Sequence, residues 1–407
     1  MTGQLQSGRS RFPALDPEPP PGQRLRRRLV PAAIAVAALV ALGLSIGLAG
    51  SSVSGSRAIA LPGVPSSTRV VLLTAHGELA TARVDGSGLV TMNSFGRFGN
   101  QAPEVSADGR YLVDRDGAIF SLSGGRVASV PTALHLGGRE AVSRAGPFAD
   151  HDRAVTVLVE GPYGSPTASA GLEVIPIATG QPISLGTADH AAGDPQSEGA
   201  FVAVPGQETG SSPASQTVPP DSAVELRDAG VPPVTLVTAT QAAAAVGMDP
   251  SLPVVLYPFP DPNGDTVAIG VSPSDGGFSE GVVVVGRTGD VQGDIQAGIG
   301  PIPDSYISWS HDGTSLAFVG DSNGPEIATW TYERGLSVAT TPRGDPGAGR
   351  CVWSTAGSSV LCSATAVTPT RYEWYYSGSP AGPVVAVKAP GYALAWLPPG
   401  SDGSPSN

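Results

Sequence analysis

Short apolar segments alternate with polar turns along most of the chain after about residue 69. The segment 306–320, YISWSHDGTSLAFVG, shows the pattern best. Ile307 and Trp309 fall on one face of a predicted strand, because side chains alternate along a strand. Leu316 and Phe318 fall on the matching face of the next strand, and a polar turn with Asp-Gly joins the two. The segment therefore predicts a β-hairpin with one buried face.

The same pattern, W-S-x-x-G-x-x-[LV]-x-[FIV], recurs along the chain in more or less degenerate form. The repeats are anchored at Val105, Phe148, Pro195, Pro260, Trp309, Trp353 and Trp396. Their spacing runs from 43 residues (105 to 148) to 65 residues (195 to 260). The residues that carry the blade motif are Asp108, Gly109, Trp309, Asp312, Gly313, Trp353 and Gly357.

A repeat of this length with several short strands is typical of a β-propeller blade. Each unit buries its strands only against its neighbours, so the ring must close. We expect the first segment (69–86) and the last (383–397) to share one blade. The prediction is an all-β propeller over 69–398 with seven blades, six or eight being the alternatives. The longest spacing contains a Ser/Pro-rich stretch near 205–222, expected to be a disordered insert.

The segment 307–320 resembles the repeat of TolB-type propellers, W-S-P-D-G-x-x-[LI]-A-F, a WD40-like unit. His311 stands where that family usually has Pro, and VSADGRYLV and CVWSTAGSSVLC match in part. The resemblance implies the propeller fold. It does not carry over the family's role in an outer-membrane-linked envelope complex, because TolB has a separate N-terminal domain and no permanent membrane anchor.

An uncharged apolar segment, residues 29–49, precedes the repeats. At about 1.5 Å per residue it reaches roughly 30 Å, the thickness of a hydrocarbon core. The RLRRR cluster before it predicts a cytoplasmic N-terminus and an extracytoplasmic C-terminal domain. The expected organisation is a disordered tail (1–28), a single-pass span, a linker (50–68), the propeller and a disordered C-terminus (399–407). A buried core helix and a signal peptide cleaved after Ala60 are the alternatives.

Gly43 and Gly47 form a G-x-x-x-G spacing inside this segment. Small residues four apart let two membrane helices approach closely, so a homodimer is one reading. The spacing also arises easily by chance in a stretch rich in Ala and Gly.

The charge distribution argues against nucleic acid as a partner. The formal net charge is −12, yet residues 1–28 hold six arginines against two acidic residues, so the remainder carries −16. Phosphate binding needs patches of Lys and Arg. The expected partners are the cytoplasmic membrane, through residues 29–49, and an envelope protein or ligand.

Cys351 and Cys362 are the only cysteines. If Trp353 pairs with Val360 on the next strand, the two cysteines face each other across the pair, a spacing that a disulfide can bridge. An extracytoplasmic domain supplies the oxidising compartment. Two free buried thiols or a metal-binding pair are the alternatives.

Three other motifs resemble functional sites. Residues 320–324 fit G-x-S-x-G, but no His follows Ser322, so a hairpin turn is the better reading. The segment 261–265 resembles the start of a calcium loop but lacks its Gly and closing Glu, which favours a turn. The aromatic stretch 371–378 suits ligand binding or packing between blades, and we favour packing. The sequence assigns no catalytic residue, no cofactor and no metal ligand.

Three functions fit these features. The first is a binding or scaffold module displayed outside the membrane, which we prefer. The second is a hydrolase or lyase, metal-dependent in one form, that uses the centre of a propeller. The third is a signalling partner that acts through the span. Fold alone does not decide between them.

Overall fold

The computed structural model describes residues 61, 64–65, 67–92, 103–106, 110–114, 117–122, 125–129, 135–136, 139–140, 142–160, 170–204, 222–273, 281–297, 307–320, 326–340, 349–354, 356–365, 372–379 and 384–397. All of them belong to one compact unit, Ala58–Asn407. Outside them lie the predicted tail, the span with Gly43 and Gly47, most of the linker, Asp108, Gly109, residues 205–221 of the insert and the C-terminus. Across these ranges, no helix is long and apolar enough to cross a membrane.

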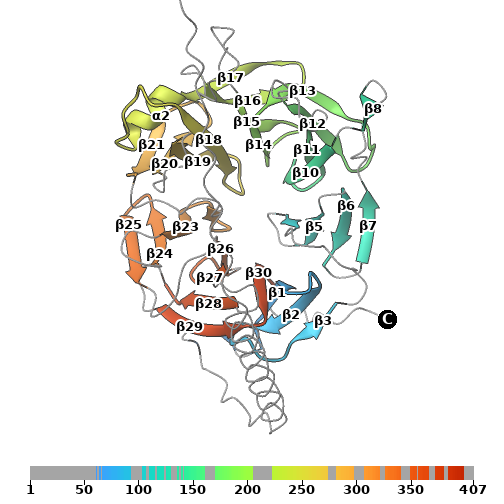
Figure 1. The fold of residues 1–407 in the computed structure, drawn as a ribbon, viewed down its shortest axis with the longest axis vertical. Helices are drawn as coiled ribbons and strands as arrows, with labels where there is room; N and C mark the ends of the chain where they lie inside the picture. The colour runs from blue at the N-terminus through green and yellow to red at the C-terminus, as the bar shows by residue number, and fades with distance from the viewer. Residues whose placement is uncertain are drawn as a thin grey trace, which may run out of the picture. The chain divides into compact units, whose positions relative to one another are not determined.

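The described residues form seven four-stranded antiparallel sheets, arranged as the blades of a ring (Figure 1). Blade 1 contains β3 (Val90–Thr91), β2 (Leu79–Arg83), β1 (Arg69–Thr74) and β30 (Gly391–Trp396); blade 2 contains β4 (Glu104–Val105), β5 (Tyr111–Val113), β6 (Ala118–Ser121) and β7 (Gly125–Ser129); blade 3 contains β10 (Val142–Ala149), β11 (Ala154–Glu160), β12 (Ala170–Pro176) and β13 (Ile183–Ala188). A two-stranded ribbon, β8 (His135–Leu136) and β9 (Arg139–Glu140), lies between blades 2 and 3 in the sequence.

The remaining four blades follow the same order. Blade 4 contains β14 (His190–Gly193), β15 (Ala200–Val204), β16 (Ala223–Asp228) and β17 (Val231–Thr238); blade 5 contains β18 (Val254–Pro260), β19 (Thr266–Pro273), β20 (Gly281–Gly286) and β21 (Val291–Ile295); blade 6 contains β22 (Ser308–Trp309), β23 (Ser315–Gly320), β24 (Glu326–Thr331) and β25 (Gly335–Thr340); blade 7 contains β26 (Gly349–Trp353), β27 (Val360–Thr365), β28 (Tyr372–Ser377) and β29 (Val384–Ala389). The preferred blade count of seven is confirmed.

The last strand closes the ring by pairing with the first. β30 pairs antiparallel with β1, with Val70 opposite Trp396 and Thr74 opposite Gly391. The backbone N–H of Leu397 then donates to the carbonyl of Arg69, 2.9 Å away. The expected shared blade is therefore present, and it joins strands from opposite ends of the propeller.

The first strand of each blade lies at the inner edge of the ring, where neighbouring first strands such as β10 and β14, or β26 and β30, contact each other (Figure 1). Because the strands alternate in direction, the ring has two ends. Turns between first and second strands, and between third and fourth strands, gather at one end, here called the tight-turn end. The connections between second and third strands, and between blades, gather at the other, here called the loop end.

Apolar clusters between adjacent blades form the core. One of them joins Ile307, Trp309, Leu316 and Phe318 of blade 6 to residues of blade 5, including Val284. The alternation in the sequence therefore placed these four side chains on one buried face. Burial of each such side chain contributes about 1.5–3 kcal/mol relative to exposure.

One short helix, α2 (Ala239–Ala245), follows β17 and was not expected from the strand pattern. Thr238 caps it: the Thr238 hydroxyl accepts from the Gln241 backbone N–H, and the Gln241 side chain accepts from the Thr238 N–H. This reciprocal arrangement is a capping box. Ala239, Ala242 and Ala243 then pack into the core between blades 4 and 5.

Candidate functional site

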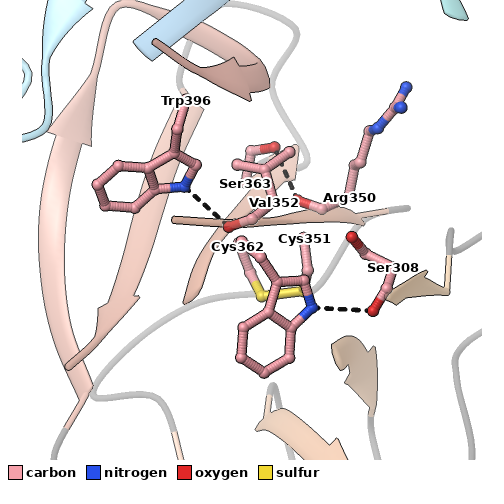
Figure 2. The surroundings of a disulfide bond; sticks show 8 residues. Ser308, Arg350, Cys351, Val352, Cys362, Ser363 and Trp396 are labelled. Carbon is pink, nitrogen blue, oxygen red and sulfur yellow. Dashed lines mark hydrogen bonds between the residues drawn. A yellow bond between two sulfur atoms is a disulfide. The ribbon is translucent and has the colours of Figure 1, made fainter. Parts of the chain in front are cut away.

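The tryptophans of the repeat tie blades 6, 7 and 1 each to the blade before it. The Trp309 indole N–H donates to the Phe259 carbonyl at 2.8 Å, and the Trp353 indole donates to the Ser308 carbonyl at 2.9 Å. Trp396 closes the series with a bond to Val352 at 2.9 Å (Figure 2). Each indole thus satisfies a backbone acceptor on the inner strand of the preceding blade. The motif tryptophans are bonded within the fold.

The motif Ser and Gly shape the turn after the inner strand in blades 6 and 7. In blade 6 the Ser310 hydroxyl accepts from the Ser315 N–H, and the Gly313 N–H donates to the Ser310 carbonyl. Gly313 has φ +70°, which favours glycine. Its position is also crowded, because an added Cβ would lie 2.9 Å from the Asp261 carboxylate of blade 5. Gly357, with φ +68°, closes the same turn in blade 7.

These turns also bond to one another at the tight-turn end. The Gln196 amide of blade 4 donates to the Asn263 carbonyl and to the Asp265 carboxylate of blade 5. The Asn263 amide donates in turn to the Asp312 carbonyl of blade 6 at 3.3 Å. The blade-motif residue Asp312 therefore joins a chain of polar contacts between blades.

An ion pair reinforces the contact between blades 4 and 5. The Arg287 guanidinium donates to both carboxylate oxygens of the fully buried Asp194, at 2.6 and 2.8 Å. The hydrogen bonds to Asp194 raise the pKa of Arg287, so the guanidinium stays charged. Two-point contact of this kind fixes geometry as well as charge.

Three consecutive residues with positive φ form the turn of blade 3. Asp150, His151 and Asp152 have φ of 46°, 50° and 67°, a conformation that non-glycine residues seldom adopt. Two N–H groups hold it: Asp150 donates to the Asp194 carbonyl and His151 donates to the Pro195 carbonyl. Contacts with blade 4 therefore sustain the strained turn, which no motif in the sequence predicts.

Asp261, the first residue of the calcium-like segment, occupies the turn position that Ser310 holds in blade 6. It is 3% exposed and accepts from the Thr266 hydroxyl and the Asp265 N–H. Gly264 has φ +75°, and its N–H donates to the Asp261 carbonyl. The segment 261–265 is thus a turn, as predicted from the sequence.

Replacing Asp261 by Asn is expected to stabilise the protein more at pH 7 than at pH 4. Burial raises the pKa of the Asp261 carboxyl above its ordinary value, so the folded state disfavours the charged form. The favourable contribution of the protonated group is therefore present at low pH and lost as pH rises through the folded pKa. Urea unfolding of the wild type and of Asp261→Asn at both pH values measures the difference.

Asp312→Asn is the matched control, because its pKa shifts the other way. Hydrogen bonds from Ser310 and Thr314 lower the pKa of Asp312. Its stabilising contribution is present at neutral pH and is lost as pH falls through the folded pKa. Asp312→Asn should therefore lower the free energy of unfolding more at pH 7 than at pH 4. If the effects of Asp261→Asn and Asp312→Asn on this free energy changed with pH in the same direction, the opposite pKa shifts of the two carboxyls would be contradicted.

The two cysteines form a disulfide between β26 and β27 (Figure 2). Trp353 pairs with Val360 and Cys351 with Cys362, the register expected from the sequence. Both cysteines are fully buried and pack with Ala317 and Val319 of blade 6. The predicted disulfide is therefore present, at an interface between blades.

The aromatic stretch of blade 7 packs into the fold. Trp374 and Tyr376 are fully buried in the cluster between blades 7 and 1, and Tyr375 packs on the opposite face with the disulfide. The Trp374 indole donates to the Gly391 carbonyl. These three rings are buried, which agrees with the prediction that the aromatic stretch packs between blades.

Four polar side chains on inner strands stay partly exposed near the loop end, and we call them the inner-strand group. They are Glu104, His190, Tyr257 and Arg350. Arg350 of blade 7 lies 3.7 Å from Glu104 of blade 2, so the pair reaches past the inner strand of blade 1. On blades 4 and 5, the His190 and Tyr257 rings lie 4.4 Å apart. In Figure 2 the Arg350 side chain points away from the disulfide.

The inner-strand group combines a cation, an anion, an imidazole and a phenol on strands that are otherwise largely apolar. Such groups offer hydrogen bonds and stacking to a ligand. No local sequence motif marks these four residues, so the sequence did not predict them. The only available signal was their position: His190, Tyr257 and Arg350 each come four residues before the turn residue that follows their strand.

Within the described ranges, no three His, Cys, Asp or Glu side chains gather closely enough to hold a metal ion. Of the G-x-S-x-G motif, Gly320 ends β23, and residues 321–324 lie outside the described part. β23 and β24 on either side of it pair antiparallel, with Gly320 opposite Glu326.

No family model and no curated protein matches the chain. Solved propeller structures do. TolB from Acinetobacter baumannii is 14% identical with a TM-score of 0.41, over 83% of this chain and 69% of that one. Hydrazine synthase from Kuenenia stuttgartiensis is 13% identical with a TM-score of 0.43, over 67% and 75%. Oligogalacturonate lyase from Vibrio parahaemolyticus is 10% identical with a TM-score of 0.43, over 77% and 91%.

These similarities carry no information on activity, and the fold rests on the strand pairing described above. That pairing defines a seven-bladed β-propeller, the fold that the motif in residues 307–320 implied.

Proposed function

We propose that the protein is a binding module of the cell envelope: residues 29–49 hold the ring at the cytoplasmic membrane and the ring engages an envelope protein or ligand outside it. The inner-strand group is the observation that supports binding. Glu104, His190, Tyr257 and Arg350 are partly exposed polar side chains on inner strands, so they can offer hydrogen bonds and ring stacking to a partner.

The disulfide supports the extracytoplasmic location. Disulfides persist in oxidising compartments and are rare in the cytosol. The Arg-rich segment before residue 29 favours the same topology, and Gly43 and Gly47 provide a helix contact should the protein dimerise.

Photocrosslinking of the full chain in cells tests the binding role. A photoreactive phenylalanine analogue at Tyr257 is expected to form a partner adduct, whereas the same analogue at Tyr332, 42% exposed at the tight-turn end, is not. Glu104→Lys should abolish the Tyr257 adduct by reversing one charge of the group. For a small ligand, native mass spectrometry of the full chain should show a bound species that Tyr257→Ala loses.

Equal adducts at both positions, or neither an adduct nor a bound ligand at Tyr257, would contradict the proposal. The tether is tested separately, by flotation of membranes that carry the full chain or a chain without residues 29–49. Only the full chain is expected to float.

A further inference from the structure

Most of the negative charge of the chain lies in blades 4 and 5. Residues 188–306, which contain both blades, carry fifteen acidic side chains and two arginines, a net charge of −13 out of the −16 that follows residue 28. A field of one sign attracts partners of the opposite sign and speeds their encounter.

The flanking blades do not reverse this sign. Residues 135–187 carry five acidic side chains against three arginines, and residues 307–340 carry four against one. The cation nearest to blade 4 in strand order is Arg144, on the inner strand β10 that contacts β14. The acidic side chains of blade 3 itself outnumber its cations.

Both arginines of residues 188–306 are engaged in the fold. Arg227 pairs with Glu225 at 2.9 Å and donates to two backbone carbonyls of β13. Arg287 is bonded to both carboxylate oxygens of Asp194. Arg350, the cation of the inner-strand group, lies on blade 7 and pairs with a carboxylate of blade 2. Blades 4 and 5 therefore attract cations from outside the chain.

The connection between blades 4 and 5 presents apolar and acidic side chains together at the loop end. It consists of α2 and residues 246–253. Leu252 is 53% exposed, Met248 is partly buried against the core between the two blades, and Asp249 is exposed. Asp294 is exposed on β21, and the chain just after β21 bonds to the backbone at the end of α2 (Figure 1). We call Met248, Asp249, Leu252 and Asp294 the blade 4–5 rim.

Local hydrogen bonds hold the blade 4–5 rim in place. The Met248 N–H donates to the Ala243 carbonyl at 2.9 Å, and the Leu252 N–H donates to the Asp249 carbonyl at 3.0 Å. The Asp249 carboxylate accepts from the backbone N–H and the hydroxyl of Ser251. These bonds lower the pKa of Asp249, so it is charged at neutral pH. A surface that is already ordered loses less entropy when it binds.

The blade 4–5 rim continues into the inner-strand group. Leu252 precedes β18, on which Val255 and Tyr257 share one face and are both partly exposed. The Tyr257 ring lies 4.4 Å from the His190 ring, and the residue before His190 is the exposed Asp189. A Lys or Arg side chain over an aromatic ring gains cation–π attraction in addition to its attraction to carboxylates.

We propose that the blade 4–5 rim and the adjoining Tyr257–His190 ring pair bind a partner segment in which basic and apolar side chains are mixed. This inference rests on the proposed function and deepens it, because it names the class of envelope partner. The carboxylates select a cationic segment, Leu252 and Met248 supply apolar area, and the ring pair receives one Lys or Arg side chain. Acidic and apolar groups on one surface are the complement of such a segment.

Binding of a labelled peptide to the full chain in non-ionic detergent tests the class of partner. The probe is a short peptide of Lys, Leu and Gly, and two twins replace every Lys by Glu or every Leu by Ser. Fluorescence anisotropy, corrected for micelles without protein, should give the probe a dissociation constant at least about tenfold below that of either twin. Added salt should weaken the probe, because it screens attraction between exposed charges.

Two matched pairs of variants locate the site. Asp249→Lys and Asp290→Lys make the same charge change at exposed aspartates that each accept a local hydroxyl bond, but Asp290 lies in the β20–β21 turn at the tight-turn end. Leu252→Ser and Val291→Ser remove apolar side chains of equal exposure, 53% and 54%, from the same two places. The first variant of each pair should weaken binding of the probe about fivefold or more, and the second should leave it within about twofold.

Several results would overturn the inference. They are absence of probe binding, equal binding of either twin, and equal weakening by Asp249→Lys and Asp290→Lys. The proposed function fails separately, through the crosslink at Tyr257. A Tyr257 adduct that Asp249→Lys leaves unchanged contradicts the inference and leaves the binding role intact. If Tyr257 gives neither an adduct nor a bound ligand, the binding role and the inference both fail.

Discussion

Removing residues 391–407 is expected to abolish the cooperative unfolding transition of the ring. The deletion takes away β30, the partner of β1 in blade 1. It removes the buried Leu394 and Trp396 and exposes the inner edge of β1. Loss of one buried Trp side chain alone costs about 3–5 kcal/mol, and a whole domain is stable by only about 5–15 kcal/mol. Urea unfolding followed by tryptophan fluorescence measures the transition.

A shorter deletion is the matched control. Removing residues 398–407 leaves β30 and the Leu397 bond to Arg69 in place. This variant should keep the midpoint and slope of the full chain. A cooperative transition of normal slope in the longer deletion would show that the ring does not need its last strand.

Loss of the disulfide is expected to lower the free energy of unfolding by about 3 kcal/mol, on the loop-entropy model. Cys351 and Cys362 are 11 residues apart, and the bond links the two innermost strands of blade 7. Alanine at both positions also leaves smaller side chains against Ala317 and Val319 of blade 6. The double variant should therefore unfold at lower urea concentration.

Ser363→Ala is the neighbouring control, because it changes a fully buried residue of β27 without touching the bond. It removes the hydrogen bond from the Ser363 hydroxyl to the Arg350 carbonyl, worth about 1 kcal/mol (Figure 2). Free thiols in the purified wild type, or equal stability of the wild type and the double cysteine variant, would overturn the prediction.

The fold was predictable from the sequence because the same hairpin pattern of apolar and polar residues recurs along the chain. Alternation within each hairpin placed Trp309 and Leu316 opposite each other, and recurrence of the unit required a closed ring. The disulfide followed from the same alternation, once Trp353 was aligned with Val360. Helix α2 was missed, although Thr238 and Gln241 carry a capping-box signature, because its seven residues interrupt a pattern read for strands.

The candidate site was not predictable in the same way. Arg350 and Glu104 are 246 positions apart in the sequence (350 against 104), and only the closed ring brings them to 3.7 Å. His190 and Tyr257 meet because the inner strands of the consecutive blades 4 and 5, β14 and β18, lie side by side. The strained turn at Asp150 depends on carbonyls of the next blade. These two side-chain pairs and the strained turn depend on contacts between blades. The hydrophobic periodicity within one blade therefore does not predict them.

Ring closure through β30 also sets the order of events during synthesis. A ribosome makes β1 early and β30 last, so β1 waits without its inner partner until nearly the whole chain exists. The contact between Val70 and Trp396 has a very large sequence separation, and folds dominated by such contacts form slowly. The disulfide hairpin of blade 7 is local and is free to form before that last step. We therefore expect closure of the ring to be the last and slowest step in the folding of this domain.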